Sequence, residues 1–386
     1  MIRVLFVSHT SELNGAELWL LETLQGLDRT KIEPLLIVPS PGRLEDAARA
    51  AGIDTSRSPL VWWISDRSRL WRQPAAWAVN RRCAARLFRL IRDGRIDLVF
   101  SNSAAVSAGA MAARRAGLPH VWAVHEMLGG PAAHLFHLCG ARRLTRFILD
   151  RSSRVIVNSR FCASAFPASE KIVLVYNGFE PKPEDVSRQA ALRREFGLGP
   201  GDPVLGIVGK LYAGKGQREA ILAAARLRRD FPRLKVLVAG EVRDADYADS
   251  LSRIAAETGL GDRVVFAGYR PDLADWLGVL SVLVVASTVE SFGRAALDAM
   301  AAGTPVVAVK AGGLPEIVRD GENGVLVTSG DPEALADGIR RVLVDPAFAR
   351  RLAESGRRTV ATEFRLDEQV RRVEAIITEC APEQSV

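Results

Sequence analysis

Two carboxylates and a helix start, grouped within one short stretch, are the residues of this chain best suited to hold a charged ligand. The apolar run Val282–Val285 is followed by Glu290, a small-residue turn and a helix that contains Asp298, eight residues further on. Ligands of open α/β sheets bind at the carboxyl ends of such strands. Free N–H groups at a helix start favour an anion, and the two carboxylates can bind hydroxyl groups. The N–H groups concerned belong to Phe292, Gly293 and Arg294. Together these are the parts needed to hold a nucleotide-sugar.

A turn that contains glycine and lysine follows another apolar run, Val204–Val208. It extends from Gly209 to Gly216 and includes Lys210 and Lys215, five residues apart. Glycine lets the backbone approach a phosphate, and two lysines can bracket a diphosphate. The spacing is not that of a P-loop, which requires Ser or Thr directly after its Gly-Lys pair. The turn is either a phosphate-binding loop or an ordinary basic turn, and its agreement with the stretch at Glu290 favours the first interpretation.

Weaker candidates lie in the first half of the chain. Asn14, Gly15 and Glu17 follow the first apolar run at the start of a predicted helix. Gly15 would let an anion or a sugar approach closely, whereas Glu17 could simply complement the helix dipole. His125 follows the apolar run Val121–Val124. A lone histidine is more often structural than catalytic, but a place at the carboxyl end of a strand favours a role in the site.

Composition and charge describe an ordinary globular protein whose charge is uneven. The 386 residues suit two domains, with 48% apolar and 25% charged residues. No apolar run reaches the roughly 18 residues that a spanning helix needs. The four cysteines are scattered without metal-ligand spacing, which indicates reduced thiols in the cytosol. Residues 1–190 contain 26 Lys and Arg against 17 Asp and Glu, whereas residues 191–386 contain 26 against 28. The basic first half suits an anionic acceptor or a membrane surface.

Strand and helix signals alternate along the chain in two series. Short β-branched runs, each followed by small or polar residues, predict buried parallel strands with helical crossovers. The first series comprises Ile2–Val7, Pro34–Val38, Asp97–Ser101, Val121–Val124, Val155–Asn158 and Ile172–Tyr176. The second comprises Val204–Val208, Lys235–Ala239, Val264–Ala267, Val282–Val285, Val306–Val309 and Val325–Val327. We therefore expect two facing Rossmann-like, doubly wound α/β domains and a ligand cleft between them. The expected segments are domains at 1–182 and 204–365, a polar linker at 183–203, and a C-terminal helix at 366–386 that packs back on the first domain.

Residues 61–95 are unusually rich in tryptophan and arginine. The segment contains nine arginines and four tryptophans: Trp62, Trp63, Trp71 and Trp77. Arg82, Arg86 and Arg89 can share one face of a helix. Such a segment either contacts an anionic membrane or forms a surface helix whose aromatic residues pack into the domain. No recognised nucleic-acid-binding module accompanies the charge, so we do not expect nucleic acid as a partner.

Taken in order, these motifs resemble those of the retaining nucleotide-sugar glycosyltransferases of the GT4 family, which have the GT-B fold. The resemblance covers nearly the whole chain. The matching motifs are Gly15-Ala-Glu17, Asp97 to Ser103, His125, Tyr176-Asn-Gly178, Gly209 to Gly216, Gly268-Tyr269, the stretch at Glu290, and Gly312 to Glu316. The resemblance implies a metal-independent transferase with no cofactor beyond its donor, because lysines and backbone amides take the place of Mg²⁺ in stabilising the leaving group.

The resemblance also implies a role for each matching residue. Four residues would act on the transferred sugar or the leaving diphosphate: His125, Lys210, Lys215 and Glu290. Eight would bind the donor: Gly15, Gly209, Tyr269, Arg270, Phe292, Gly293, Arg294 and Asp298. Three would bind the acceptor: Asn14, Glu17 and Ser103. Within the donor set, Tyr269 and Arg270 correspond to the place where the family holds the nucleobase, and Asp298 to its ribose contact.

Two positions depart from the family pattern. Lys210 stands where the family usually has arginine, so the charge is kept but the bidentate fork is lost. Asp298 stands where the family usually has glutamate, and its shorter side chain would remodel the ribose contact. Both changes keep the charge, so we expect activity. The alternatives are a degenerate nucleotide-sugar-binding or scaffold protein, and an epimerase or phosphorylase with the GT-B fold.

The sequence therefore predicts a cytoplasmic, retaining hexosyltransferase that uses a UDP- or GDP-linked sugar. Its acceptor would be a hydroxyl group of a glycan, a lipid-linked molecule or a small molecule, in the synthesis of a cell-envelope polysaccharide or a glycoconjugate. If residues 61–95 contact a membrane rather than form a surface helix with packed aromatic residues, the protein would be peripheral at the inner face of an anionic membrane. The oligomeric state is open.

Overall fold

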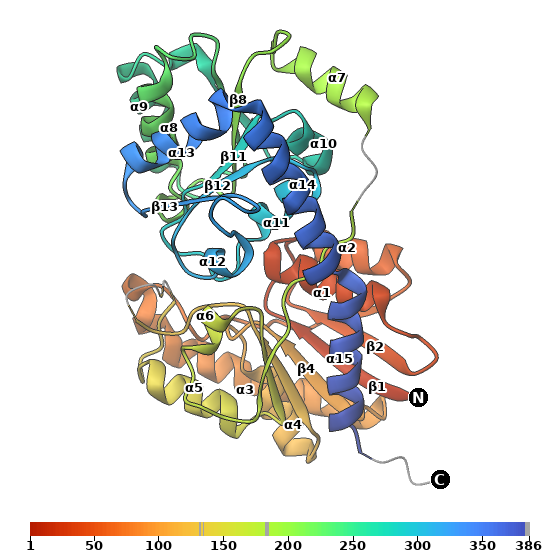
Figure 1. Cartoon of the computed structure of the whole chain (residues 1–386). Helices are drawn as coiled ribbons and strands as arrows, with labels where there is room; N and C mark the ends of the chain where they lie inside the picture. The colour runs from red at the N-terminus through yellow and green to blue at the C-terminus, as the bar shows by residue number, and fades with distance from the viewer. Residues whose placement is uncertain (131–132, 134, 182–184, 383–386) are drawn as a thin grey trace. The chain divides into compact units, whose positions relative to one another are not determined.

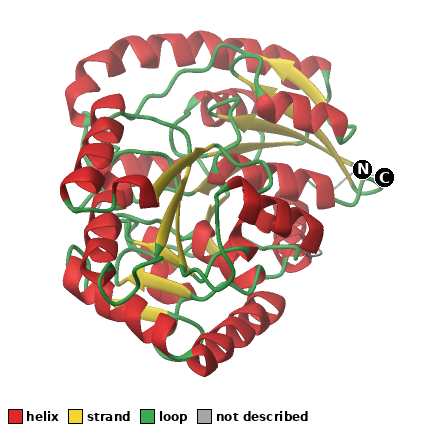
Figure 2. Cartoon of the chain, turned by 90° about the horizontal axis from the view of Figure 1, so that it is seen from above, coloured by secondary structure: helices red, strands yellow, loops and turns green. Residues whose placement is uncertain are grey.

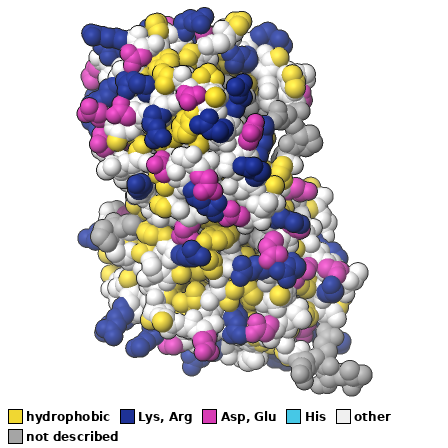
Figure 3. Space-filling view, viewed as in Figure 1, with side chains coloured by type: hydrophobic (Ala, Val, Ile, Leu, Met, Phe, Trp, Pro, Cys, Tyr) yellow, Lys and Arg dark blue, Asp and Glu magenta, His cyan; other side chains and the backbone are white. Residues whose placement is uncertain are grey.

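The computed structural model describes residues 1–130, 133, 135–181 and 185–382. The chain divides into two compact units. The first consists of Met1–Gly178 and Leu366–Val386, and the second of Phe179–Arg365. Figure 1 traces both units, and Figure 2 shows from above that their strands lie among helices. On the face drawn in Figure 3, Lys and Arg side chains are spread over both units.

The first unit is built on a seven-stranded sheet with the order β3-β2-β1-β4-β5-β6-β7. All of its strand pairs are parallel. The strands are β1 (Ile2–Ser8), β2 (Ile32–Val38), β3 (Asp54–Arg57), β4 (Leu98–Asn102), β5 (His120–Val124), β6 (Arg154–Val157) and β7 (Ile172–Leu174). The strand order reverses between β1 and β4, which makes their carboxyl ends the topological switch point of this sheet. The predicted strands are confirmed, and β3 is an addition at the sheet edge.

Helices cover the first sheet and bring the C-terminal residues back to it. They are α1 (Gly15–Gly26), α2 (Arg43–Ala50), the 3-10 helix η1 (Arg67–Arg72), α3 (Gln73–Asp93), α4 (Ala108–Ala116), α5 (Ala141–Asp150), α6 (Arg160–Ala163) and α15 (Leu366–Cys380). Apolar residues of α15 join the core cluster that also contains Trp19 and Leu24 of α1, and Gln369 donates to the Thr23 hydroxyl at 2.7 Å. The last helix is therefore an integral part of the first unit.

The second unit is built on a six-stranded parallel sheet with the order β10-β9-β8-β11-β12-β13. The strands are β8 (Val204–Val208), β9 (Lys235–Ala239), β10 (Val264–Gly268), β11 (Val282–Val285), β12 (Val306–Val309) and β13 (Val325–Val327). The helices are α7 (Val186–Glu195), η2 (Ala213–Lys215), α8 (Gln217–Leu227), α9 (Ala245–Glu257), η3 (Gly261–Arg263), α10 (Leu273–Gly278), α11 (Arg294–Ala301), α12 (Leu314–Ile317), α13 (Pro332–Val344) and α14 (Pro346–Glu363). The switch point of this sheet lies between β8 and β11. The second series of predicted strands is thus confirmed.

The segment 183–203, which we expected to be a linker, contains helix α7. Arg188 on α7 donates through Nε to Asp272 at 3.1 Å, and Leu192 is fully buried. Asp185 caps the helix by accepting from the Arg188 backbone N–H at 3.0 Å. The helix belongs to the second unit, where it packs against α10. Its mostly polar sequence concealed it, because a single buried side chain gives no periodic signal.

Within the described part of the chain, no helix has both the length and the apolar character needed to cross a bilayer.

Candidate functional site

The glycine- and lysine-containing turn lies at the switch point of the second sheet. It leaves the carboxyl end of β8 and leads through η2 into α8. Gly216 has a φ of 69°, and a Cβ atom there would lie 2.0 Å from the carbonyl oxygen of Ala286, directly after β11. The Gln217 side chain donates to the Lys210 carbonyl at 3.0 Å. Only glycine at position 216 lets the turn pack this closely against the strand beside it.

Lys215 and Glu290 form an ion pair where the β8 and β11 connections meet. Lys215 Nζ lies 2.7 Å from Glu290 Oε2, and the two side chains are 24% and 18% exposed. Burial lowers the pKa of Lys215, but the negative charge of Glu290, aided by Tyr212 and by the hydrogen bond to Glu290, outweighs burial and holds that pKa above its ordinary value. A fixed, partly buried positive charge therefore sits at the switch point, where it can neutralise an anion.

Two glycines hold the backbone of Glu290 in place. A Cβ atom at Gly312 would lie 1.8 Å from the Glu290 carbonyl oxygen, and the φ of Gly312 is 57°. The backbone N–H of Gly313 donates to the same oxygen at 2.8 Å. The turn after β12 thus supports the turn after β11. The sequence motif Gly312 to Glu316 gave no indication of this contact, because the contact depends on two loops that are far apart in the sequence.

A helix begins shortly after Glu290, as the sequence predicted. Helix α11 begins at Arg294, and Gly293 precedes it with a φ of 116°. The Phe292 ring is buried and meets Phe364 edge-on, with ring centroids 6.0 Å apart. Arg294 Nε lies 3.8 Å from Asp298 Oδ1, one helical turn away. Asp298 therefore has a cation beside it on its own helix.

Three further predicted site residues, Lys210 of the catalytic set and Tyr269 and Arg270 of the donor-binding set, lie after the ends of β8 and β10. Lys210 Nζ is 3.9 Å from Glu241 Oε2, which is a long and exposed contact. Tyr269 is exposed. The guanidinium of Arg270 donates to Asp272 at 2.9 Å and to Glu195 of α7 at 2.7 Å, and its contact with a nucleobase stays a prediction. The hydrogen bond to Glu195 fastens α7 to the rest of the second unit, which sequence motifs could not reveal because α7 itself was not predicted.

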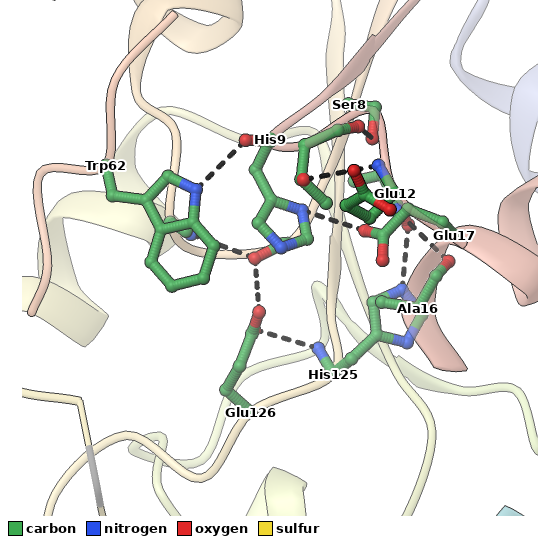
Figure 4. A network of polar contacts seen from close by, with 12 residues as sticks. Ser8, His9, Glu12, Ala16, Glu17, Trp62, His125 and Glu126 are labelled. Carbon is green, nitrogen blue, oxygen red and sulfur yellow. Dashed lines mark hydrogen bonds and ion pairs between the residues drawn. The ribbon is translucent and has the colours of Figure 1, made fainter. Parts of the chain in front are cut away.

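In the first unit, His125 directly follows β5, the strand next to β4, at the carboxyl ends of the strands (Figure 4). Its Nε2 is 2.8 Å from Asn102 Oδ1 at the end of β4, and Asn102 in turn donates to the Ala16 carbonyl at 3.1 Å. Trp19 lies edge-on to the imidazole, with ring centroids 5.0 Å apart. Burial, aided slightly by His9, lowers the pKa of His125 to about 3. The ring is therefore neutral at pH 7, and its Nδ1 has no hydrogen-bond partner among the described residues.

Glu17 is fully buried beside a histidine that the sequence analysis did not select. His9 Nδ1 lies 3.0 Å from Glu17 Oε1. Trp62 lies on the other side of His9 from Glu17 (Figure 4): its indole N–H donates to the His9 carbonyl at 2.9 Å, and the centroids of the His9 and Trp62 rings are 5.1 Å apart. Burial lowers the pKa of His9 to about 4 and raises that of Glu17 to about 8. At pH 7 the pair is a protonated carboxyl group beside a neutral imidazole. His9 was recognisable by the argument used for His125, since it follows the first strand.

A prediction follows for the pH dependence of stability. The Glu17 carboxyl binds its proton up to about pH 8 when folded but loses it near its ordinary pKa of 4.5 when unfolded. Between these values the folded state holds more protons, so this group lowers stability as the pH rises. We expect Glu17→Gln to become progressively more stable relative to the wild type from about pH 5 to about pH 8. Urea unfolding of both proteins across that range measures it, and parallel stability curves would contradict it.

The remaining first-unit candidates divide into one enclosed and two accessible residues. Ser103 is fully buried, has a φ of 82°, and its hydroxyl donates to Glu126, which also accepts from the Ala104 N–H at 3.2 Å. The hydroxyl is thus engaged within the first unit, and the acceptor contact of Ser103 stays a prediction. The Glu126 hydrogen bonds offset the backbone strain at Ser103.

The two accessible residues lie at the start of α1. Gly15 is exposed with open space around its Cα, and Asn14 precedes α1 without capping it through its side chain.

Among the residues that the structure describes, no group of three or more His, Cys, Asp or Glu side chains could hold a metal ion.

Both units of the chain match models of glycosyltransferase families. Residues 13–182 match the family model "Glycosyltransferase Family 4", and residues 188–359 match "Glycosyl transferases group 1". A D-inositol 3-phosphate glycosyltransferase of Mycobacterium sp. (strain JLS) is 36% identical over 193 residues, which cover 48% of this chain and 43% of the relative. The enzyme of the same name from Stackebrandtia nassauensis is 31% identical over 239 residues, which cover 57% and 54%. The chain thus spans about half the length of the curated relatives it matches.

Solved structures extend the agreement to the fold of the whole chain. HepE of Anabaena, in a crystal structure with UDP-glucose, is 25% identical with a TM-score of 0.84, covering 98% of this chain and all of the other. A glycosyltransferase of Rickettsia africae has a TM-score of 0.83 at 19% identity and covers 100% and 99%, which shows the fold alone.

Proposed function

We propose that this chain, which belongs to the group 1, family 4 glycosyltransferases and has the GT-B fold, moves a sugar from a UDP-sugar to an acceptor hydroxyl. The reaction is retaining and independent of metal ions. UDP is the favoured nucleotide because HepE, which is similar along its whole length, was crystallised with UDP and with UDP-glucose.

The observation that carries the proposal is the pair of Lys215 and Glu290 at the switch point of the second sheet. The ammonium group of Lys215 suits the diphosphate of the donor, and the Glu290 carboxylate, 2.7 Å away, can accept hydrogen bonds from the hydroxyl groups of its sugar. We assign Lys215 and Lys210 to the diphosphate, Glu290 to the sugar hydroxyls and Asp298 to the ribose. The positive charge is in place before the donor binds, so little reorganisation is needed when the leaving group becomes more negative.

The first-unit residues are assigned to the sugar and its acceptor. His125 is neutral and its orientation is fixed by Asn102, so it serves as a hydrogen-bond partner for a hydroxyl group rather than as a general acid. Gly15 lets the acceptor or the donor phosphate approach the start of α1. The acceptor oxygen attacks the anomeric carbon on the face from which the diphosphate leaves, and the departing phosphate oxygen takes the acceptor proton. The protein contributes orientation and charge stabilisation.

The acceptor class follows from charge. The first half of the chain carries nine more basic than acidic residues, which suits an acceptor that bears phosphate. An inositol phosphate is the first acceptor to test, because the curated relatives carry that name.

The test is the anomeric configuration of the product formed from UDP-α-glucose, with an inositol phosphate or water as the acceptor. Proton NMR of early time points should show the α product, and excess EDTA should leave the rate unchanged. A β product would overturn retention, and loss of the rate in EDTA would overturn metal independence. Binding of UDP without any turnover would favour the degenerate nucleotide-sugar-binding alternative.

A further inference from the structure

The outward side of η1 and α3 in the first unit presents tryptophan and arginine without acidic residues between them. From residue 67 to residue 92 the sequence has eight arginines and neither Asp nor Glu. We call this region the Arg–Trp surface. Its members, all exposed, are Arg67, Arg69, Trp71, Arg72, Trp77, Arg81, Arg82, Arg86, Arg89 and Arg92.

The opposite side of α3 is fixed in the core. Leu87 and Ile91 belong to a buried apolar cluster, and the buried Asn80 side chain donates to the Val61 carbonyl at 2.8 Å. The apolar face of this helix is therefore occupied by its own unit and cannot be inserted into lipid. Any surface that binds here must be recognised by the arginines and the exposed tryptophans alone.

The tryptophans of the segment divide by exposure. Trp63 is 4% exposed and packs into the domain, as one of the two interpretations of the sequence predicted, whereas Trp71 is 72% and Trp77 48% exposed. Arg72 lies over the Trp71 ring at 5.0 Å and Arg81 over the Trp77 ring at 4.8 Å. Rings that combine an apolar body with an N–H donor favour the boundary between lipid and water.

Neighbouring elements add to the positive charge. On α4, which packs against α3, Arg115 lies over the Phe88 ring at 4.5 Å. The acidic residues at the two ends of the surface are Asp66 and Asp93, and Asp66 is 3.6 Å from Arg69. The positive charge therefore lies on η1 and on the part of α3 from Arg81 onward, whereas Gln73–Asn80 adds none. The α3 arginines extend from Arg81 to Arg92, which corresponds to about 17 Å at 1.5 Å per residue.

We propose that the Arg–Trp surface docks on a bilayer that contains anionic phospholipids. Two groups of exposed arginines with no acidic residue between them complement a plane of lipid phosphates, and arginine binds phosphate oxygens in a bidentate manner. Trp71 lies in the first group and Trp77 just before the second, and both lie at the level of the headgroups. This docking needs neither the transferase reaction nor a bound donor, so it stands apart from the proposed function.

The test is co-sedimentation of the full chain with vesicles of phosphatidylcholine alone and of phosphatidylcholine mixed with an equal amount of phosphatidylglycerol. We expect binding to the mixed vesicles only, and release by salt because exposed charges are screened. The triple variant Arg82→Gln, Arg86→Gln and Arg89→Gln should bind on the order of 100-fold more weakly, since each basic residue near an anionic surface contributes roughly fivefold.

A matched triple variant separates this surface from general charge. Arg226, Arg229 and Arg253 are exposed on or near α8 and α9 of the second unit, and their replacement by glutamine removes the same charge elsewhere. Unchanged binding by this control, together with loss in the first triple variant, supports the proposal. Equal losses in the two triple variants, equal binding to neutral vesicles, or no binding to mixed vesicles would overturn it, as would preferential binding to a nucleic acid duplex. A second readout is tryptophan fluorescence, whose blue shift on mixed vesicles should be lost in Trp71→Ala with Trp77→Ala.

Discussion

Replacement of Lys215 by alanine is expected to lower kcat/KM for the UDP-sugar by about 100- to 1,000-fold, the usual effect of removing one preorganised stabiliser of developing charge. The structure gives two reasons for a large effect. The ammonium group is three-quarters buried at the switch point, where water screens charge poorly, and it holds Glu290 at 2.7 Å. The variant therefore loses the positive charge that we assign to the diphosphate. It also removes the ion-pair partner of Glu290, whose carboxylate we assign to the sugar. UDP release from UDP-glucose measures the effect.

A matched lysine in the same unit provides the control. Lys235 is the first residue of β9, so it lies at the amino ends of the strands, away from the site at their carboxyl ends. Lys235→Ala removes an equal charge there. The control should retain nearly full activity, and Lys215→Arg should recover part of what the alanine variant loses. If Lys215→Ala and Lys235→Ala had similar kcat/KM values, the assignment of Lys215 to the diphosphate would be wrong.

Replacement of Gly216 by alanine is expected to lower the free energy of unfolding of the second unit by roughly 3 kcal/mol or more, through strain and overpacking combined. The φ of 69° is unfavourable for a residue with a side chain, and the added Cβ atom would lie 2.0 Å from the Ala286 carbonyl oxygen. Backbone cannot move aside as a flexible side chain can. Because the turn after β8 also carries Lys215, donor binding should weaken together with stability. Urea unfolding and UDP titration measure the two effects.

A control at Gly330 separates the cost of backbone strain from the cost of the steric clash. This glycine has a φ of 75°, and an added Cβ atom would meet nothing within 4 Å. Gly330→Ala should therefore cost only about 1 kcal/mol, the usual penalty for a side chain in the left-handed region. Similar costs for Gly216→Ala and Gly330→Ala would show that the close approach to Ala286 is relaxed in solution.

The strands of the second unit were predictable almost residue by residue. Every residue of Val282–Val285 and Val306–Val309 is buried, so each strand is a continuous apolar run bounded by small or polar residues. Strand β3 escaped because Asp54–Arg57 is polar and lies at the sheet edge, where hydrophobic patterning has no cause. Helix α7 escaped for a similar reason, since its attachment relies on ion pairs rather than on an apolar stripe.

The candidate site was predictable in its motifs but not in its pairings. That Lys215 and Glu290 belong to one site followed from the rule on strand ends, but their mutual ion pair depends on how two separate turns approach each other. Glu17 illustrates the limit more clearly. A glutamate in the first turn of a helix is normally exposed, and only the tertiary packing of β1, α1 and Trp62 shows that this one is buried beside His9. The support of Glu290 by Gly312 was hidden for the same reason.

The central claim, that this chain binds a nucleotide-sugar through its second unit, is tested most directly by the melting temperature of the protein in the presence of UDP, GDP and ADP and their common sugar conjugates. A ligand that binds only the folded state must raise the Tm by mass action. We predict that UDP and a UDP-sugar raise the Tm of the wild type, that EDTA does not abolish the shift, and that Lys215→Ala greatly reduces it. The absence of a shift with every nucleotide at millimolar concentration would contradict the account.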